Sequence, residues 1–455
     1  MDRQIVDESG ARFAAYVEEL ASVIGHADRA KPLRDYCRGL LLPGERKSVE
    51  PMAAVTAPER TAAQHQSLLH FVGQAAWSDE NVLAKVRELV VPEIEGHGPI
   101  EAWIIDDTGF PKQGRHSVGV ARQYCGQLGK QDNCQVAVSL SLANHHASLP
   151  VAYRLYLPKD WAQDDERRRK VGVPEEIDFK TKPQIALDQI RWACDADLPR
   201  GVVLMDPGYG NDSKLRTGIT ALGLTYVAGI QSNILVCELK QGRRGAAQQP
   251  VTAKKLALSL PAHAWRKITW REGTAGKLSS RFARVKVRVG NHRQPIEDRA
   301  QQCLLIEWPE GEPAPTKYWL STLPHNISFR RLVDIAKLRW RIERDYQELK
   351  QEVGLGHFEG RGWRGFHHHA TLCIAAYGFL VSERETIPPL GPDSARMFPQ
   401  LAVPDGYRPR GSAAAHPASC SKLDRHRAPQ VDRRAGPRTV AMPMLRRSDQ
   451  QTNAA

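Results

Sequence analysis

The stretch Trp103-Ile-Ile-Asp-Asp-Thr-Gly-Phe110 has the form of a buried strand that ends in acid, and the same form returns in Val202-Val-Leu-Met-Asp-Pro-Gly-Tyr209. Each apolar run is followed by a turn signal, Thr-Gly or Pro-Gly. In open α/β sheets, sites form beyond the carboxyl ends of the strands. One such aspartate often only caps a turn, but the repeated pattern predicts that Asp107 and Asp206 hold a metal ion together.

The sequence around these two runs predicts an α/β core with a mixed sheet over residues 96–231. Alternating or apolar stretches at 135–143, 151–157 and 224–230 indicate further strands. A helical stretch over 183–193 separates the third and fourth strands. Strands interrupted by helices are typical of an α/β fold.

The composition and the apolar spacing of the sequence change on either side of this core. Residues 1–95 carry apolar side chains at helical spacing and predict a helical N-terminal domain that binds DNA. Residues 232–322 are rich in strand signals and predict a mostly β insertion. Residues 323–385 predict helices that complete the core, and residues 386–455 predict a disordered basic tail rich in Pro, Arg, Ala and Ser.

The strongest helix signal, over 329–353, carries a third acid. Its buried stripe is formed by Ile335, Leu338, Ile342 and Leu349. Arg339, Glu343 and Lys350 follow one another on a second stripe directly beside the first. A charged row at the margin of a buried face favours a cleft, and the alternative is a solvated face with pairing along the helix.

The overall charge points to a polyanionic partner. The chain has 455 residues, a formal net charge of +13 and a sequence pI near 9.4, and such an excess favours nucleic acid or an acidic membrane surface. No apolar run approaches the roughly 20 residues that span a bilayer, and the N-terminus lacks the apolar core of a signal peptide. The eight scattered cysteines do not form a disulfide framework, so we expect a cytoplasmic protein.

Taken in order, these motifs resemble the DDE transposases of bacterial insertion sequences. In the group with a β insertion, the first acid stands in an Asp-Thr strand end, here Asp107-Thr108, and the second is matched by Asp206. The Tyr-Arg-Glu-Lys signature is matched by Arg339, Glu343 and Lys350, whereas Ala336 stands where the signature has Tyr. The segments 106–112, 122–126 and 357–361 also resemble one subgroup of these enzymes.

The resemblance implies an RNase H-like catalytic core and two-metal chemistry at phosphorus. Asp107 would bridge two Mg²⁺ ions, with Mn²⁺ as a substitute, while Asp206 and Glu343 would each hold one. Arg339 and Lys350 would contact phosphates.

The resemblance also implies the partners. They would be double-stranded DNA carrying terminal inverted repeats, target DNA and a second copy of the chain, in a nucleoid-associated cytoplasmic setting. Related enzymes stack an insertion-domain Trp on a flipped base, which makes Trp265 and Trp270 candidates for DNA binding. The alternative is that both rings pack a small β core.

The resulting hypothesis is a transposase that cuts and transfers DNA strands in the cut-and-paste movement of an insertion sequence. One alternative is an RNase H-like nuclease that hydrolyses DNA without strand transfer. Another is a DNA-binding transposase derivative without catalysis, which the intact set of three acids disfavours. Inverted repeats flanking the gene would distinguish the transposase from the nuclease.

Overall fold

The computed structural model describes residues 2–239, 249–273, 276–290 and 299–386. Contacts group the chain into one unit that spans Met1–Ala402 and a second that spans Val403–Ala455. The tail predicted over 386–455 lies outside the described residues apart from Thr386. None of the described helices is both long enough and apolar enough to cross a lipid bilayer.

The N-terminal part is helical, and its helices pack against the last described helix, α14 (Trp363–Thr386). Its helices are α1 (Asp2–Ser22), α2 (Ala30–Leu41), α3 (Val49–Thr56), α4 (Thr61–Gly73) and α5 (Asp79–Gly96). The Tyr16 hydroxyl donates a hydrogen bond of 2.9 Å to the Ala375 carbonyl, and the Tyr36 hydroxyl lies 2.9 Å from Nδ1 of His369. The helices predicted for residues 1–95 therefore share a core with α14, which is more than 260 residues away in sequence.

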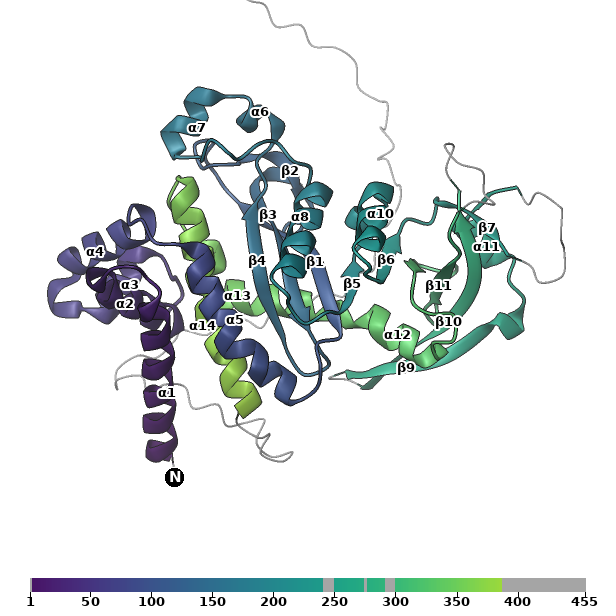
Figure 1. Cartoon of the computed structure of the whole chain (residues 1–455), viewed down its shortest axis with the longest axis horizontal. Helices are drawn as coiled ribbons and strands as arrows, with labels where there is room; N and C mark the ends of the chain where they lie inside the picture. Colours follow the sequence, from purple (N-terminus) through teal and green to yellow (C-terminus); the bar gives the residue numbers. More distant parts are fainter. Residues whose placement is uncertain (1, 240–248, 274–275, 291–298, 387–455) are drawn as a thin grey trace, which may run out of the picture. The chain divides into compact units, whose positions relative to one another are not determined.

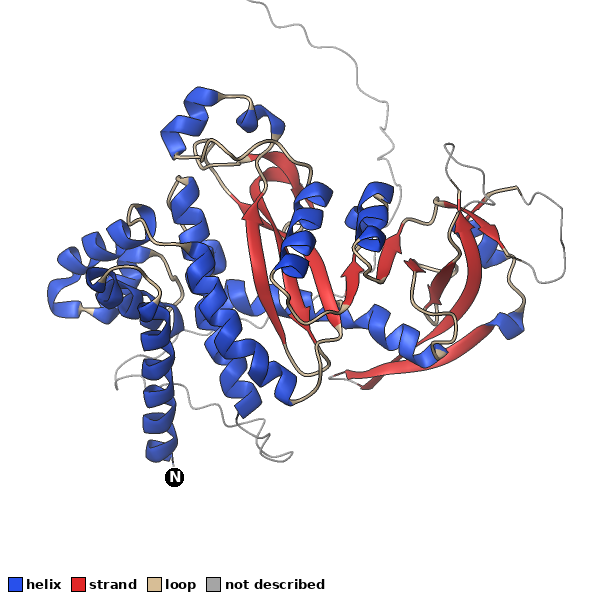
Figure 2. Ribbon diagram, in the orientation of Figure 1, coloured by secondary structure: helices blue, strands red, loops and turns tan. Residues whose placement is uncertain are grey.

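A mixed sheet forms the centre of the first unit (Figures 1 and 2). Its first strands are β1 (Ala102–Pro111), β2 (Ala121–Cys125), β3 (Lys130–Ala143), β4 (Ser148–Leu155), β5 (Val202–Met205) and β6 (Tyr226–Ile230). The order is β2-β3-β1-β5-β6, and β4 pairs with β3. Strand β1 is antiparallel to β3 and parallel to β5, which is parallel to β6.

Helices cover both faces of this part of the sheet (Figure 1). The helices between β4 and β6 are α6 (Lys159–Ala162), α7 (Asp165–Val171), α8 (Lys182–Asp195), α9 (Pro207–Gly210) and α10 (Ser213–Ala221). Helix α8 begins with a capping box formed by Thr181 and Gln184, and it lies with α10 on one face of the sheet. Helix α13 (Trp340–Gln351) lies on the other face, where the Tyr346 hydroxyl is 2.5 Å from Oγ of Ser139.

The region between residues 232 and 322 is mostly β structure and continues the same sheet. Its elements are β7 (Leu235–Glu238), β8 (Val251–Thr252), α11 (Ala253–Leu258), β9 (Trp265–Gly273), β10 (Gly276–Val289), β11 (Gln302–Trp308) and β12 (Lys317–Ser321). Strand β12 pairs antiparallel with β6, so the insertion extends the edge of the core sheet. The result is one sheet of 12 strands among the described residues.

The helix predicted as one piece over 329–353 consists of two, α12 (Phe329–Leu338) and α13. They meet at Arg339, which is the C-cap of α12 and the N-cap of α13 and keeps helical dihedral angles (φ −54°, ψ −25°). Because the break falls at Arg339, α12 packs on the insertion while α13 packs on the core. Arg339 therefore lies between the helix on the insertion and the helix on the core.

Candidate active site

Two aspartates directly follow the paired parts of β1 and β5. Parallel strands β1 and β5 are in register from Ala102 opposite Val202 to Ile105 opposite Met205. Asp106 is the next residue of β1, and Asp206 follows β5 as the N-cap of α9, where its Oδ1 accepts a hydrogen bond of 3.2 Å from the Tyr209 amide. The register thus brings both aspartates to the carboxyl ends of the two strands. They are close enough that the Asp206 charge raises the pKa of Asp106.

Arg339 joins one of these aspartates to the acid on α13. Its Nη1 lies 2.8 Å from Oδ2 of Asp106, and its Nη2 lies 2.9 Å from Oε1 of Glu343. Burial alone would lower the pKa of the Arg339 guanidinium, but the charges of Asp106, Glu343 and Asp206 raise it above its ordinary value. A single guanidinium thus interacts with three carboxylates that come from β1, the end of β5 and α13.

The pKa of Asp106 reflects its burial and its charged neighbours. Burial raises the pKa of the Asp106 carboxyl group to about 7; Arg339 opposes the shift and the nearby Asp206 carboxylate adds to it. Desolvation and like charge both disfavour an ionised acid, whereas a neighbouring cation favours it. The group therefore depends on a positive charge to stay ionised.

The side chain of Asp107 lies on the opposite face of the sheet from that of Asp106. Adjacent residues of a strand face opposite sides of the sheet, and Asp107 lies on the α8 side. Nζ of Lys182 is 2.7 Å from its Oδ2, and the Tyr209 hydroxyl donates to the same oxygen at 3.1 Å. In the structure, Asp106 rather than Asp107 lies with Asp206 and Glu343 around Arg339, and metal binding by Asp107 stays a prediction. The signal for Asp106 was present in the same strand end, but the facing of two consecutive aspartates depends on the strand register.

The donor set consists of carboxylates, which suit a hard divalent cation, and Arg339 forms ion pairs with two of them. Three carboxylates from separate elements offer the oxygen ligands that Mg²⁺ and Mn²⁺ prefer. Among the described residues, the only group of three potential ligands with donor atoms within 4.8 Å of one another is His97, His146 and Glu385. The three acids therefore lie farther apart than that, held around the guanidinium. They fit metal ions provided that Arg339 releases Asp106 and Glu343.

Lys350, the second predicted cation, borders the cluster at the C-terminal end of α13. Its Nζ donates to the Gly109 carbonyl at 2.9 Å and lies 3.3 Å from Oε1 of Gln127. It also lies 5.1 Å from the centre of the Phe110 ring. Burial lowers the pKa of the Lys350 ammonium to about 8. Lys350 thus connects α13 to β1 next to the acids.

The two tryptophans predicted to bind DNA, Trp265 and Trp270, pack within the insertion. The Trp265 ring meets Trp308 edge to face at 5.2 Å, and Trp270 meets Phe282 edge to face at 5.7 Å. Nζ of Lys337 lies 4.1 Å from the centre of the Trp270 ring. These contacts favour the packing interpretation, and a role in DNA stacking stays a prediction.

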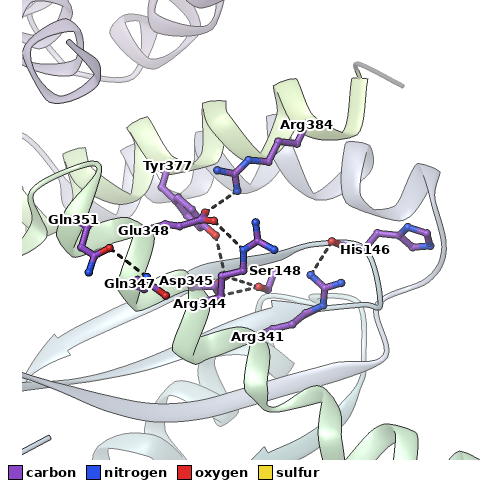
Figure 3. Close-up of polar contacts among 10 residues, drawn as sticks. All are labelled: His146, Ser148, Arg341, Arg344, Asp345, Gln347, Glu348, Gln351, Tyr377 and Arg384. Carbon is purple, nitrogen blue, oxygen red and sulfur yellow. Dashed lines mark hydrogen bonds and ion pairs between the residues drawn. The ribbon is translucent and has the colours of Figure 1, made fainter. Parts of the chain in front are cut away.

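A buried polar network fixes the opposite side of α13 (Figure 3). Ser148 Oγ lies 2.6 and 2.7 Å from the two carboxylate oxygens of Asp345, and the Tyr377 hydroxyl donates to one of them at 2.9 Å. Glu348 accepts hydrogen bonds from Arg344 and Arg384. Burial raises the pKa of Asp345 to about 6, while the Ser148 and Tyr377 hydrogen bonds oppose this shift. The network ties α13 to β4 and α14.

Replacement of Asp345 with Ala is expected to destabilise the protein by about 1–3 kcal/mol, because the buried hydroxyls of Ser148 and Tyr377 both lose their acceptor. The measurement is the midpoint of urea denaturation. Gln347→Ala is the matched control, because Gln347 is exposed and bonds only its helix neighbour Gln351 at 3.3 Å. Equal midpoints for the two variants would contradict an anchoring role for Asp345.

Two protein-family models and a known protein match parts of the chain. Residues 19–277 match the family model described as DDE superfamily endonuclease, and residues 178–379 match the model described as transposase DDE domain. The chain is 29% identical over 190 residues to a probable transposase for insertion sequence element IS701 from Microchaete diplosiphon. That match covers 42% of this chain and 46% of the relative, so the matched part spans about half the length of the curated protein.

Proposed function

Since this chain belongs to the DDE superfamily of endonucleases and transposases, we propose that it cuts the ends of an insertion sequence and transfers them to new DNA. Membership in this family implies an RNase H-like core and the use of divalent metal ions. Cut-and-paste transposition with Mg²⁺, or Mn²⁺ in its place, is the activity proposed for the whole protein. The proposed partners are double-stranded DNA with terminal inverted repeats, target DNA and a second copy of the chain.

The observation that carries this proposal is the cluster of Asp106, Asp206 and Glu343 around Arg339. We assign the metal ligands to these three acids, so Asp106 replaces Asp107 in the predicted set. When bound, divalent ions would activate the attacking oxygen and stabilise the leaving oxygen at phosphorus. Asp106 and Asp206 are fixed by the sheet, whereas the Glu343 side chain is 67% exposed and joins them from α13.

In this proposal Arg339 first neutralises the acids and later binds a DNA phosphate. Before metal binding, its guanidinium neutralises the acids, which otherwise repel one another. Once it releases Asp106 and Glu343, it is free to grip a DNA phosphate, for which its planar fork of donors is suited. Lys350, at the other end of α13, would act on the same strand. Phosphate contacts of this kind position DNA and carry no sequence information.

The N-terminal helices are proposed to recognise the element's ends. They are basic in places, and Arg46 forms an ion pair with Glu359, which lies between α13 and α14. They also share a core with α14. DNA bound to these helices would therefore be held at a fixed position relative to the catalytic sheet.

The decisive experiment uses the full-length protein and a plasmid that carries the element's own ends. Cleavage at those ends is expected with Mg²⁺ or Mn²⁺ and not in EDTA, and joined products are expected when target DNA is added. Cleavage without joined products would favour the nuclease alternative. Specific binding with no cleavage under any metal condition would favour the non-catalytic alternative, and equal cleavage in EDTA would rule out the metal mechanism.

A further inference from the structure

A β-hairpin packs against the end of β1, a few residues beyond Asp106. It consists of β2, the turn 126–129 and the start of β3. Its end packs against β1 so closely that a Cβ atom added at Gly109 would lie 2.9 Å from Sγ of Cys125. The turn residue Gln127 also contacts Lys350. Gly109 lies three residues beyond Asp106, which is roughly 10 Å along a strand.

The inward side of this hairpin holds it in place. Cys125 is fully buried, and the Gln123 amide donates to the Cys134 carbonyl at 2.9 Å. The turn is closed by a hydrogen bond of 3.0 Å from the Leu128 amide to the Cys125 carbonyl, and Gly129 adopts a positive φ of 63°. The outward side chains are therefore presented from a rigid support.

The outward side exposes large apolar groups. Arg122 and Tyr124 alternate with the inward residues and face solvent. The Tyr124 residue is 58% exposed, and Leu128 in the turn is 42% exposed. Large apolar side chains gathered on a rigid surface commonly mark a binding site, whereas single ones need no explanation.

Cations accompany these apolar side chains. Arg122 shares the exposed face with Tyr124, and Lys130 follows the turn, where its Nζ lies 3.1 Å from Asp132. The chain as a whole carries a formal net charge of +13. An aromatic ring among basic groups is the arrangement that binds single-stranded nucleic acid, because every base offers a flat face and every nucleotide a negative charge.

We propose that the β2–β3 hairpin holds the DNA strand next to the cleaved phosphodiester, with Tyr124 stacked on an unpaired nucleobase. Leu128 would lie against the neighbouring base step, as apolar wedges do in proteins that open DNA locally. Arg122 and Lys130 would contact the backbone phosphates. This inference rests on the proposed function, because the hairpin packs against the same strand, β1, that carries Asp106 and contacts Lys350 on the same helix as Glu343.

The test measures DNA binding by the full-length protein without metal, so that it does not depend on catalysis. The probe is a single-stranded oligothymidylate with one fluorescent 2-aminopurine, whose emission falls when the base stacks. Tyr124→Ala is expected to bind the probe roughly 5- to 100-fold more weakly and to lose the quenching, because stacking on an aromatic side chain contributes this much per base. Tyr124→Phe keeps the ring and is expected to behave as wild type.

A second pair of variants controls for the loss of exposed apolar surface. Leu128→Ala is expected to weaken binding, whereas Leu258→Ala, on α11 and 52% exposed, is expected to leave it unchanged. Wild-type affinity and quenching in Tyr124→Ala would overturn the inference. A change in oligomeric state of Tyr124→Ala with unchanged quenching would also overturn it and would indicate a contact between copies of the chain.

The two proposals fail in different ways. Quenching that depends on Tyr124, in a protein that cleaves no DNA with any metal, would support the hairpin as a binding site and overturn the proposed function. Metal-dependent cleavage of the element's ends, in a protein whose probe binding ignores Tyr124, would do the opposite.

Discussion

Replacement of Asp106 with Asn is expected to reduce metal-dependent DNA cleavage by roughly a thousandfold or more. The substitution keeps the shape of the side chain but removes one negative ligand from the cluster around Arg339. The loss of a charged metal ligand removes several kcal/mol of transition-state stabilisation, and each 1.4 kcal/mol or so is a factor of ten in rate. The measurement is the rate of cleavage of a plasmid with the element's ends, alongside the affinity for the same DNA, which is expected to persist.

Asp107→Asn is the matched control, since it makes the same change one residue along the same strand. Asp107 pairs with Lys182 and Tyr209 on the α8 side, so its substitution breaks a partly buried ion pair there and leaves the acids around Arg339 in place. We therefore expect Asp107→Asn to keep its rate within about tenfold of wild type. The reverse result, with Asp107→Asn inactive and Asp106→Asn active, would restore the assignment made from the Asp-Thr motif.

Replacement of Lys337 with Met is expected to lower the free energy of unfolding by about 3–5 kcal/mol, because it leaves a buried carboxylate without its partner. Nζ of Lys337 lies 2.7 and 2.6 Å from the two oxygens of Glu307, whose side chain is only 4% exposed. The rings of Trp270, Phe282 and Trp319 lie 4.1 to 5.5 Å from the same ammonium. Burial lowers its pKa to about 8 while Glu307 opposes the shift. The measurement is the midpoint and slope of urea denaturation.

Two further variants separate the charge from the packing. Lys267→Met breaks the exposed pair between Lys267 and Glu310 in the same insertion, and an exposed pair contributes at most about 1 kcal/mol. The double variant Lys337→Met, Glu307→Leu removes both buried charges and is expected to recover much of the lost stability. If Lys337→Met were no less stable than Lys267→Met, the buried pair would not be what joins α12 to the insertion.

Several local features of the fold were predictable because they depend on neighbours in the sequence. The stretches 135–143 and 202–205 both lie within strands, as their composition and apolar pattern predicted. The predicted strand at 151–157 ends two residues earlier, at Leu155. Helix periodicity likewise identified the stretch that holds α12 and α13. It could not show their separation at Arg339, because the dihedral angles there remain helical.

The structure also decided how distant segments share one core. Residues 1–95 have the helical pattern of a separate domain, yet Tyr16 and Tyr36 bond to groups on α14. The strands of the insertion extend the core sheet through the pairing of β12 with β6. Pairing partners of this kind are chosen by complementary surfaces far apart in sequence, and no local pattern specifies them.

The sequence by itself determined which residue types the site would contain: acids at two strand ends, with a glutamate and two cations on one helix face. The tertiary structure alone decided between Asp106 and Asp107. Consecutive residues of a strand face opposite sides of a sheet, and a shift of one residue in register exchanges them. The choice therefore depends on the pairing of Ile105 with Met205 and on the side of the sheet that α13 covers, which are contacts between segments about one hundred residues or more apart.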